Sequence, residues 1–132
     1  MLVDSNVIFD LLSDDAEWFD WSVDAIESVA QRARLIVNPV IFAEVSIRYS
    51  RVEDVDAALP QDMFDREPLP YEAAFVAGKA FLAYRRRGGT KRMVLPDFFV
   101  GAHAAVAGYD LLTRDPARYR TYFPKLGLIA PE

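Results

Sequence analysis

Short apolar runs alternate along the chain with longer segments in which apolar residues recur at helical spacing. The runs are too brief for helices and are typical of buried strands, and they lie at 1–4, 35–37, 110–113 and 127–130. Helical spacing, with proline at helix starts and glycine at helix ends, predicts helices over 7–12, 15–33, 40–49, 52–59, 71–87 and 96–107. The proline-rich stretch 61–70 predicts a loop with one brief strand around Leu69.

Strands that alternate with helices predict an α/β fold with a short, mostly parallel β-sheet. The 132 residues fit one compact domain, and we expect a single domain over residues 1–132. Hydrophobic residues make up 52% of the chain, which is enough to build a core.

Several classes of protein are disfavoured by what the sequence lacks. The chain has no cysteine, which excludes disulfides and thiolate metal sites. The N-terminus has neither the basic start nor the long apolar run of a signal peptide. The longest uncharged run, 98–109, is too short to span a bilayer. We therefore expect a cytoplasmic protein without a membrane partner.

Charge is distributed unevenly along the chain. The net charge is −5, but residues 1–75 carry 5 Lys/Arg against 16 Asp/Glu, whereas residues 76–132 carry 10 against 4. Such asymmetry is compatible with a polyanion site in the basic half. Two solvated faces of opposite sign are the alternative.

Four carboxylates stand beside apolar runs rather than among polar residues: Asp4, Glu44, Asp97 and Asp115. In an open α/β sheet, the carboxyl ends of the strands and the helix starts that follow them converge on one crevice. Asp4 and Asp115 follow predicted strands and Asp97 opens a predicted helix. We therefore expect these acids to meet.

Each acid also has a structural alternative. Asp4, Asp97 and Asp115 stand where helix N-caps would stand. Glu44 lies among bulky apolar neighbours, where a carboxylate must be paired or bound to a metal. A helical ion pair between Glu44 and Arg48, four residues later, is the simpler explanation for that residue.

If the four carboxylates converge, their chemistry follows. Clustered negative charges repel one another and require a cation, and all-oxygen ligation selects Mg²⁺ or Mn²⁺. Such ions promote phosphodiester hydrolysis. Ser5, Asn6 and Thr113 would orient waters or the carboxylates from a second ring.

Four segments together resemble the motifs of PIN-domain ribonucleases, and the chain end is similar to that of VapC toxins. The segments, in order, are Leu2-Val3-Asp4-Ser5-Asn6-Val7, residues 38–45 around Glu44, residues 95–104 around Asp97, and residues 111–119 around Asp115. Each motif alone is weakly specific, but the four in order cover nearly the whole chain.

The resemblance implies a parallel sheet flanked by α-helices on both sides and a Mg²⁺- or Mn²⁺-dependent endoribonuclease site. It implies that Asp4, Glu44, Asp97 and Asp115 are the acidic catalytic and metal-binding quartet. It also implies an RNA substrate, a homodimer and inhibition by a cognate VapB-like antitoxin. The acidic segments 14–27 and 53–67 match no motif of the family.

Two other functions compete with a ribonuclease toxin. A catalytically silent PIN-like domain would bind RNA or metal and act through a partner. A different Mg²⁺ phosphatase or nuclease would need an Asp-x-Asp motif after the first strand, where this chain has Asp4-Ser5-Asn6.

Basic residues gather shortly before Asp97 and around Asp115. They form a candidate RNA-binding set: Arg85, Arg86, Arg87, Lys91, Arg92, Arg114 and Arg118. Phosphate contacts of this kind bind RNA without reading its sequence. A solvated helix end is the alternative interpretation of the first five.

Other polar and aromatic residues receive structural expectations. His103, the only histidine, lies in an alanine-rich helix, where packing is favoured over catalysis. We expect Asp10, Asp14, Asp15 and Asp20 on a solvated face. Trp18 and Trp21, with the 40–49 helix, are expected in the core, in dimer contacts or in a groove for the antitoxin.

Overall fold

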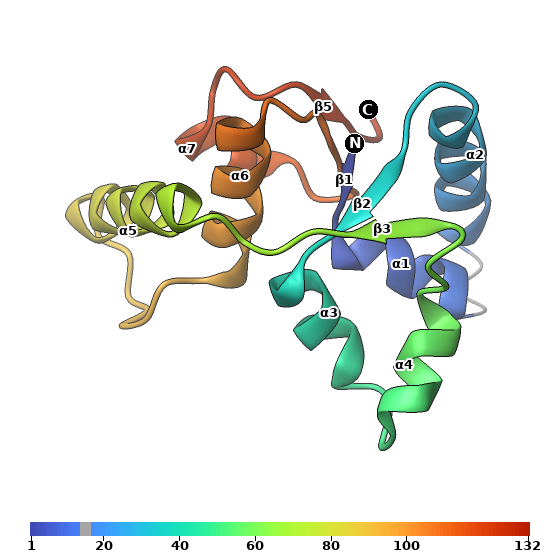
Figure 1. Ribbon diagram of the computed structural model, residues 1–132. Helices are drawn as coiled ribbons and strands as arrows, with labels where there is room; N and C mark the ends of the chain where they lie inside the picture. The colour runs from blue at the N-terminus through green and yellow to red at the C-terminus, as the bar shows by residue number, and fades with distance from the viewer. Residues whose placement is uncertain (14–16) are drawn as a thin grey trace.

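The computed structural model describes residues 1–13 and 17–132 (Figure 1). The strands are β1 Leu2–Val3, β2 Leu35–Val37, β3 Phe64–Arg66, β4 Leu111–Leu112 and β5 Leu128–Ile129. The helices are α1 Ser5–Leu12, α2 Phe19–Ala30, α3 Pro39–Ser46, α4 Val52–Ala58, α5 Tyr71–Arg86, α6 Pro96–Ala107 and α7 Ala117–Tyr122. Within the described ranges, no helix combines the length and the apolar character that a membrane crossing needs.

The five strands form one parallel sheet in the order β3-β2-β1-β4-β5. Leu2 in the central strand β1 pairs with Ile36 on one side and Leu111 on the other. In Figure 1, α1 and α2 lie on one side of the sheet and α5, α6 and α7 lie on the other. The predicted α/β fold with a parallel sheet and helices on both sides is therefore confirmed.

The central strands β1 and β4 are short and fully buried. Leu2, Val3, Leu111 and Leu112 are all fully buried. Parallel strands need helical crossovers, so both faces of such a sheet are packed and its strands are apolar throughout. This packing fixes the carboxyl ends of β1 and β4, where the next residues are polar.

Helix α3 begins at a polar cap that is itself buried. The Asn38 side chain accepts a hydrogen bond from the Ile41 amide, with a 3.0 Å N···O distance, and Pro39 occupies the first turn. The Asn38 amide nitrogen lies 3.0 Å from Nδ1 of His103, which is 1% exposed. Burial lowers the pKa of His103. The histidine thus packs against the cap of the helix that carries Glu44, as its expected packing role required.

Helix α6 has the boundaries that the sequence predicts. Pro96 stands in its first turn, and Gly108 ends it in the left-handed conformation with φ of 75°. Its neighbour α5 packs along it through the rings of Phe81 and Phe98, whose centroids are 6.3 Å apart. Asp97 is consequently held at the first turn of a well-anchored helix.

Two predictions of secondary structure were wrong. The brief strand lies at Phe64–Arg66 and not around Leu69, because Pro68 and Pro70 flank Leu69 and lack the N–H groups that a strand donates. The long helix predicted over 15–33 is shorter: α2 runs over Phe19–Ala30, and residues 15 and 16 lie outside the described part of the chain.

Candidate active site

The four predicted carboxylates gather at the carboxyl edge of the sheet. Asp4 follows β1, Asp115 follows β4 after two residues, Asp97 lies in the first turn of α6, and Glu44 lies in α3. The charge of Asp97 raises the pKa of both Asp4 and Glu44. Asp115 in turn raises the pKa of Asp97. The acids are therefore close enough to interact, as the motif order implied.

Asp4 is the most deeply buried member of this carboxylate cluster, with only 3% of its surface exposed. Its Oδ1 atom accepts a hydrogen bond of 2.8 Å from the Ser5 amide, which caps helix α1. Its Oδ2 atom accepts bonds of 2.9 Å from the Thr113 hydroxyl and 2.8 Å from the Tyr119 hydroxyl. The capping role considered for Asp4 is thus real, but it uses only one of the two oxygens.

Burial raises the pKa of Asp4 from 3.8 to about 6, and the nearby charge of Asp97 adds to the rise. The hydrogen bonds from Tyr119 and Thr113 act in the opposite direction because they favour the charged form. A carboxyl group whose pKa is raised this far, beside other acids, indicates that the negative charge at this place is insufficiently balanced.

Among the four acids, Glu44 shows most clearly that its negative charge lacks a compensating partner. Burial, followed by the charge of Asp4, raises its pKa from 4.5 to about 7, although a hydrogen bond with the Ser5 side chain lowers it. Its Oε1 atom is buried and has no hydrogen-bond partner among the described residues. The expected alternative, an ion pair with Arg48, is absent from the described ion pairs, since the Arg48 guanidinium lies 4.2 Å from the ring centroid of Phe9.

Asp97 and Asp115 form the outer part of the carboxylate cluster. Burial raises the pKa of Asp97, whereas the adjacent Arg118 guanidinium, whose Nη1 atom is 3.2 Å from Oδ2, lowers it. The Tyr119 hydroxyl lies 3.4 Å from Oδ1 of Asp97. Asp115 is exposed, and its backbone N–H donates to the Thr113 hydroxyl. Within the cluster, solvent exposure therefore increases from the buried Asp4 to the exposed Asp115.

The three polar residues predicted around the acids take different parts in this arrangement. Thr113 connects directly to Asp4, and the Asn6 amide nitrogen donates to the Thr113 hydroxyl over 3.3 Å. The Asn6 side-chain oxygen Oδ1 accepts a hydrogen bond from the Arg114 backbone N–H, with a 3.1 Å N···O distance. These bonds join the end of β1 to the end of β4, so the two strands present their carboxylates in a fixed relation.

Tyr119 is a member of the site that the sequence reasoning missed. It is 1% exposed, it lies on α7, and its hydroxyl is in contact with Asp4 and Asp97. In the sequence it stands between Arg118 and Arg120, where a tyrosine suggests a solvated helix. The sequence offers no local signal for this role, because Asp115 lies before α7 and the contacts of Tyr119 with Asp4 and Asp97 depend on tertiary packing.

The expectation that Asp10 lies on a solvated face was wrong. Asp10 is 2% exposed, and its Oδ2 atom accepts hydrogen bonds of 2.8 Å from both the Ser22 hydroxyl and the Arg114 Nε. The Arg114 guanidinium also lies 5.4 Å from a Trp18 ring centroid. Among the predicted RNA-binding residues, Arg114 is thus committed to joining α1 and α2 to the loop after β4. Asp14 and Asp15 lie outside the described residues.

The remaining predicted RNA-binding residues separate into three groups. Arg85 donates through Nη1 to the carbonyls of Gly89 and Lys91, and so fastens the loop that follows α5. Arg87 and Arg118 lie against aromatic rings near Asp97. Arg86, Lys91 and Arg92 are exposed. Only Arg87 and Arg118 line a pocket beside the acids, among the described pockets.

The donor set suits a hard divalent cation in its chemistry. Asp4, Glu44, Asp97 and Asp115 offer only oxygen ligands, and the buried Glu44 Oε1 lacks a partner. In the described residues, however, no three acidic or histidine side chains are gathered closely enough to hold one ion. Asp97 is turned to Arg118, so a bound cation requires side-chain rearrangement at this residue.

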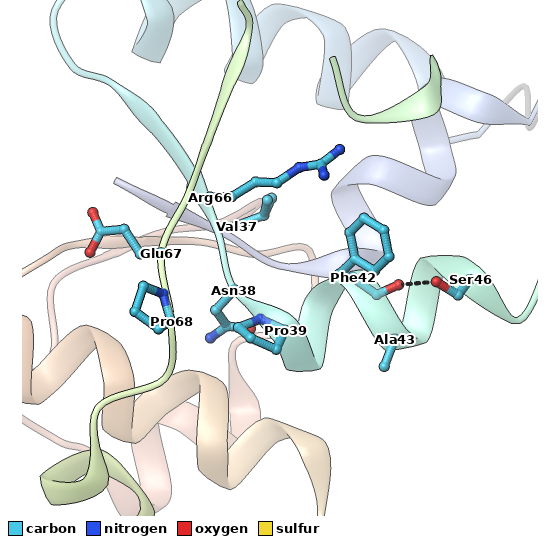
Figure 2. Close-up of a pocket in the computed structure, with 9 residues that line it drawn as sticks. All are labelled: Val37, Asn38, Pro39, Phe42, Ala43, Ser46, Arg66, Glu67 and Pro68. Carbon is cyan, nitrogen blue, oxygen red and sulfur yellow. Dashed lines mark hydrogen bonds between the residues drawn. The ribbon is translucent and has the colours of Figure 1, made fainter. Parts of the chain in front are cut away.

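A larger pocket, of about 670 Å³, lies apart from the carboxylate cluster, between α3 and the segment that leaves β3. Figure 2 shows the Arg66 side chain extending toward Phe42 of α3, and none of the four acids lines the pocket. The Tyr109 hydroxyl donates its one hydrogen to the Glu67 carboxylate and lies 2.9 and 2.7 Å from the two oxygens, and the Arg66 guanidinium lies over Phe42.

Comparison with known proteins places the chain in a family. Residues 1–124 match the PIN domain. The chain therefore belongs to the PIN domain family, whose members are nucleases. No curated protein matches the chain.

Solved structures of toxin–antitoxin complexes share the fold at low sequence identity. A chain of VapBC2 from Rickettsia felis bound to a promoter DNA fragment has a TM-score of 0.76 at 13% identity, with 99% of this chain and 98% of that chain covered. VapBC-1 from nontypeable Haemophilus influenzae has a TM-score of 0.73 at 15% identity, with 98% of this chain and 96% of that chain covered. A toxin–antitoxin complex from Klebsiella pneumoniae has a TM-score of 0.69 at 20% identity, with 99% of this chain and 97% of that chain covered.

Glu44→Gln is expected to stabilise the metal-free protein at neutral pH. The folded protein keeps the Glu44 proton up to about pH 7, whereas the unfolded chain loses it near the ordinary value of 4.5, so the contribution of Glu44 to stability falls as pH rises between these values. The gain is on the order of 1–2 kcal/mol at pH 8, reduced from the full shift because the side chain is partly exposed, and it disappears near pH 4.5.

Urea unfolding of both proteins in chelator, at pH 5 and pH 8, measures this difference. Glu27→Gln is the matched control, because Glu27 is exposed on α2, and it is expected to change stability by less than about 0.5 kcal/mol. A Glu44→Gln gain that is equal at both pH values would contradict the assigned cause.

Tyr119→Phe is expected to destabilise the protein by roughly 1–3 kcal/mol, because it removes a buried hydrogen bond to the Asp4 carboxylate. In the Asp4→Asn background the same change should cost less, since the charged acceptor is gone. Denaturant unfolding of the two single variants and the double variant gives the coupling between the residues. Tyr71→Phe, at a side chain that is 94% exposed, should have no effect. Additive costs would mean that the hydroxyl does not act through Asp4.

Proposed function

We propose that this protein is a Mg²⁺- or Mn²⁺-dependent endoribonuclease that acts as the toxin of a type II toxin–antitoxin module. The observation that carries the proposal is the cluster of Asp4, Glu44 and Asp97, in which the pKa of Asp4 is raised to about 6 and that of Glu44 to about 7. Membership in a nuclease family and the fold shared with VapBC chains support the same conclusion.

The four acids together are the proposed metal ligands, from the buried Asp4 to the exposed Asp115. A divalent cation held by these acids would act as a Lewis acid toward a phosphodiester. Ser5, Asn6 and Thr113 set the orientation of Asp4 through the hydrogen bonds described above. Tyr119 fixes the second oxygen of Asp4 while it lies beside Asp97.

The chain's own residues also prepare the site for a polyanion. Arg118 lies 3.2 Å from Asp97, where it partly balances the charge of that acid and stands ready to contact an approaching phosphate. The exposed residues Arg86, Lys91 and Arg92 on and after α5 supply longer-range attraction for RNA. RNA is proposed as the substrate on these grounds together with the toxin fold.

The proposed partners are a VapB-like antitoxin and a second copy of the chain, in the cytoplasm. The relatives by fold are described as VapBC and toxin–antitoxin complexes, which supports an antitoxin partner. An acidic pocket attracts cations, so an antitoxin segment with Arg or Lys is the expected inhibitor. Trp18 and Trp21 on and before α2, with α3, are the proposed groove for this segment.

Asp97→Asn is expected to lower RNA cleavage by at least about a hundredfold while the protein stays folded, because it removes one charged ligand from the proposed metal site. Purified wild type and variant are compared on single-stranded RNA with Mg²⁺ or Mn²⁺, and circular dichroism reports the fold. Asp20→Asn, at an exposed acid in the first turn of α2, is the matched control and should cleave like wild type.

Excess chelator should abolish cleavage by the wild type, and added Mg²⁺ or Mn²⁺ should restore it. Robust cleavage in chelator, or full activity of Asp97→Asn, would overturn the mechanism. RNA binding without cleavage by the wild type, in the presence of either ion, would favour the catalytically silent alternative.

A further inference from the structure

A pocket of about 580 Å³ opens directly beside the carboxylate cluster, between the end of α5 and helix α7. Its lining includes two arginines, two tyrosines and two aspartates: Arg87, Arg118, Tyr84, Tyr122, Asp97 and Asp115. Asp97 and Asp115 belong to the candidate active site, so whatever occupies this pocket lies next to the reacting centre. We call it the arginine–tyrosine pocket.

Both arginines of the pocket lie near aromatic rings, and only Arg118 forms an ion pair within the described residues, with Asp97. The Arg87 guanidinium lies 5.8 Å from the Tyr122 ring centroid, and Arg118 lies 6.0 Å from that of Tyr84. Arg87 forms no ion pair within the described residues, and Arg118 uses one nitrogen for Asp97. An arginine placed against an aromatic face keeps the N–H groups at its edge available, and these fit a phosphate.

The two tyrosines are fixed before any ligand arrives. Their rings lie 5.6 Å and 5.2 Å from the fully buried ring of Phe98 in α6. The loop after α5 also holds Tyr84, because the Lys91 amide donates to its hydroxyl. Gly89 passes so close to the Tyr84 ring that a Cβ atom would collide with it. The aromatic walls are therefore preorganised, which reduces the entropic cost of binding.

We infer that the arginine–tyrosine pocket is the subsite that binds a nucleotide of single-stranded RNA next to the scissile phosphate. The inference rests on the proposed ribonuclease function and specifies which residues hold the substrate. Unpaired bases stack on aromatic side chains, and their phosphates pair with arginine. Arg87 and Arg118 hold the phosphate, and Tyr122 or Tyr84 supports the base.

The pocket makes a different prediction from the exposed basic residues around it. Arg86, Lys91 and Arg92 lie outside its lining and contribute only general attraction. Arg87 and Arg118 act on one nucleotide at a defined place. Loss of either pocket arginine should therefore cost far more affinity for a short RNA than loss of another arginine on the same helix.

The test measures binding of a fluorescein-labelled single-stranded RNA tetranucleotide to the non-cleaving Asp4→Asn protein, by fluorescence anisotropy. Arg87→Ala and Arg118→Ala should each weaken binding about tenfold, the usual effect of losing one charge-assisted phosphate contact. Arg120→Ala is the matched control, because Arg120 is an exposed arginine of α7 outside the pocket, and it should stay within about twofold. Arg118→Lys should recover part of the loss, and circular dichroism establishes that each variant is folded.

Base stacking is tested with tetranucleotides that carry one abasic residue at each position in turn. For the Asp4→Asn protein, one position should stand out with a loss of about five- to a hundredfold. Tyr122→Leu, which keeps apolar volume against Phe98, should weaken binding of intact RNA and remove the difference at that position. Equal losses at all positions would contradict a defined base subsite.

The outcomes separate this inference from the function on which it rests. If the wild type cleaves RNA but Arg87→Ala and Arg118→Ala bind like Arg120→Ala, the pocket is not the subsite and the ribonuclease function stands. If the wild type neither binds nor cleaves RNA with Mg²⁺ or Mn²⁺, both fall together.

Discussion

The structure depends on how one buried carboxylate, that of Asp4, is satisfied. An ionisable group with 3% exposure is costly unless hydrogen bonds compensate for the lost water. Three short bonds do so, and they come from Ser5 at the start of α1, Thr113 after β4 and Tyr119 on α7. Residues more than a hundred positions apart in sequence are thereby tied to a single side chain.

The same carboxylate cannot be considered alone, because its neighbours carry the same charge. Burial raises the pKa of Asp4, Glu44 and Asp97. The charge of Asp97 further raises that of Asp4, the charges of Asp4 and Asp97 further raise that of Glu44, and the hydrogen bonds offset only part of these effects. The fold therefore retains an excess of negative charge at the edge of the sheet. Arg118 and Arg87 line the pocket on its open side together with Asp97 and Asp115, so positive charge stands beside these two acids.

Much of this arrangement could be predicted because local signals and the sheet topology agree. The apolar runs located four of the five strands, and Pro96 and Gly108 bounded the helix that carries Asp97. Strand β3 was not predicted at its true position, because only Phe64 of its three residues is buried and Arg66 is exposed. Such a strand has no apolar run in the sequence.

The residues that could not be predicted are those whose role depends on distant partners. Tyr119 stands between arginines in the sequence, and only the packing of α7 against the sheet brings its hydroxyl to Asp4. Asp10 looked solvated among other acids, but Arg114, which binds it, follows more than a hundred residues later. Local patterns report a residue's own helix face, whereas these contacts are decided by tertiary structure.

The position of Tyr119 has a consequence for the order in which the protein is made. A chain that emerges from the ribosome folds its N-terminal elements first, but the candidate active site draws on α1, α3, α6 and α7. Until α7 has left the ribosome, Asp4 lacks the hydroxyl that holds its second oxygen. A nascent chain that still lacks α7 is therefore incomplete at the candidate active site, although the strand that carries Asp4 is made first.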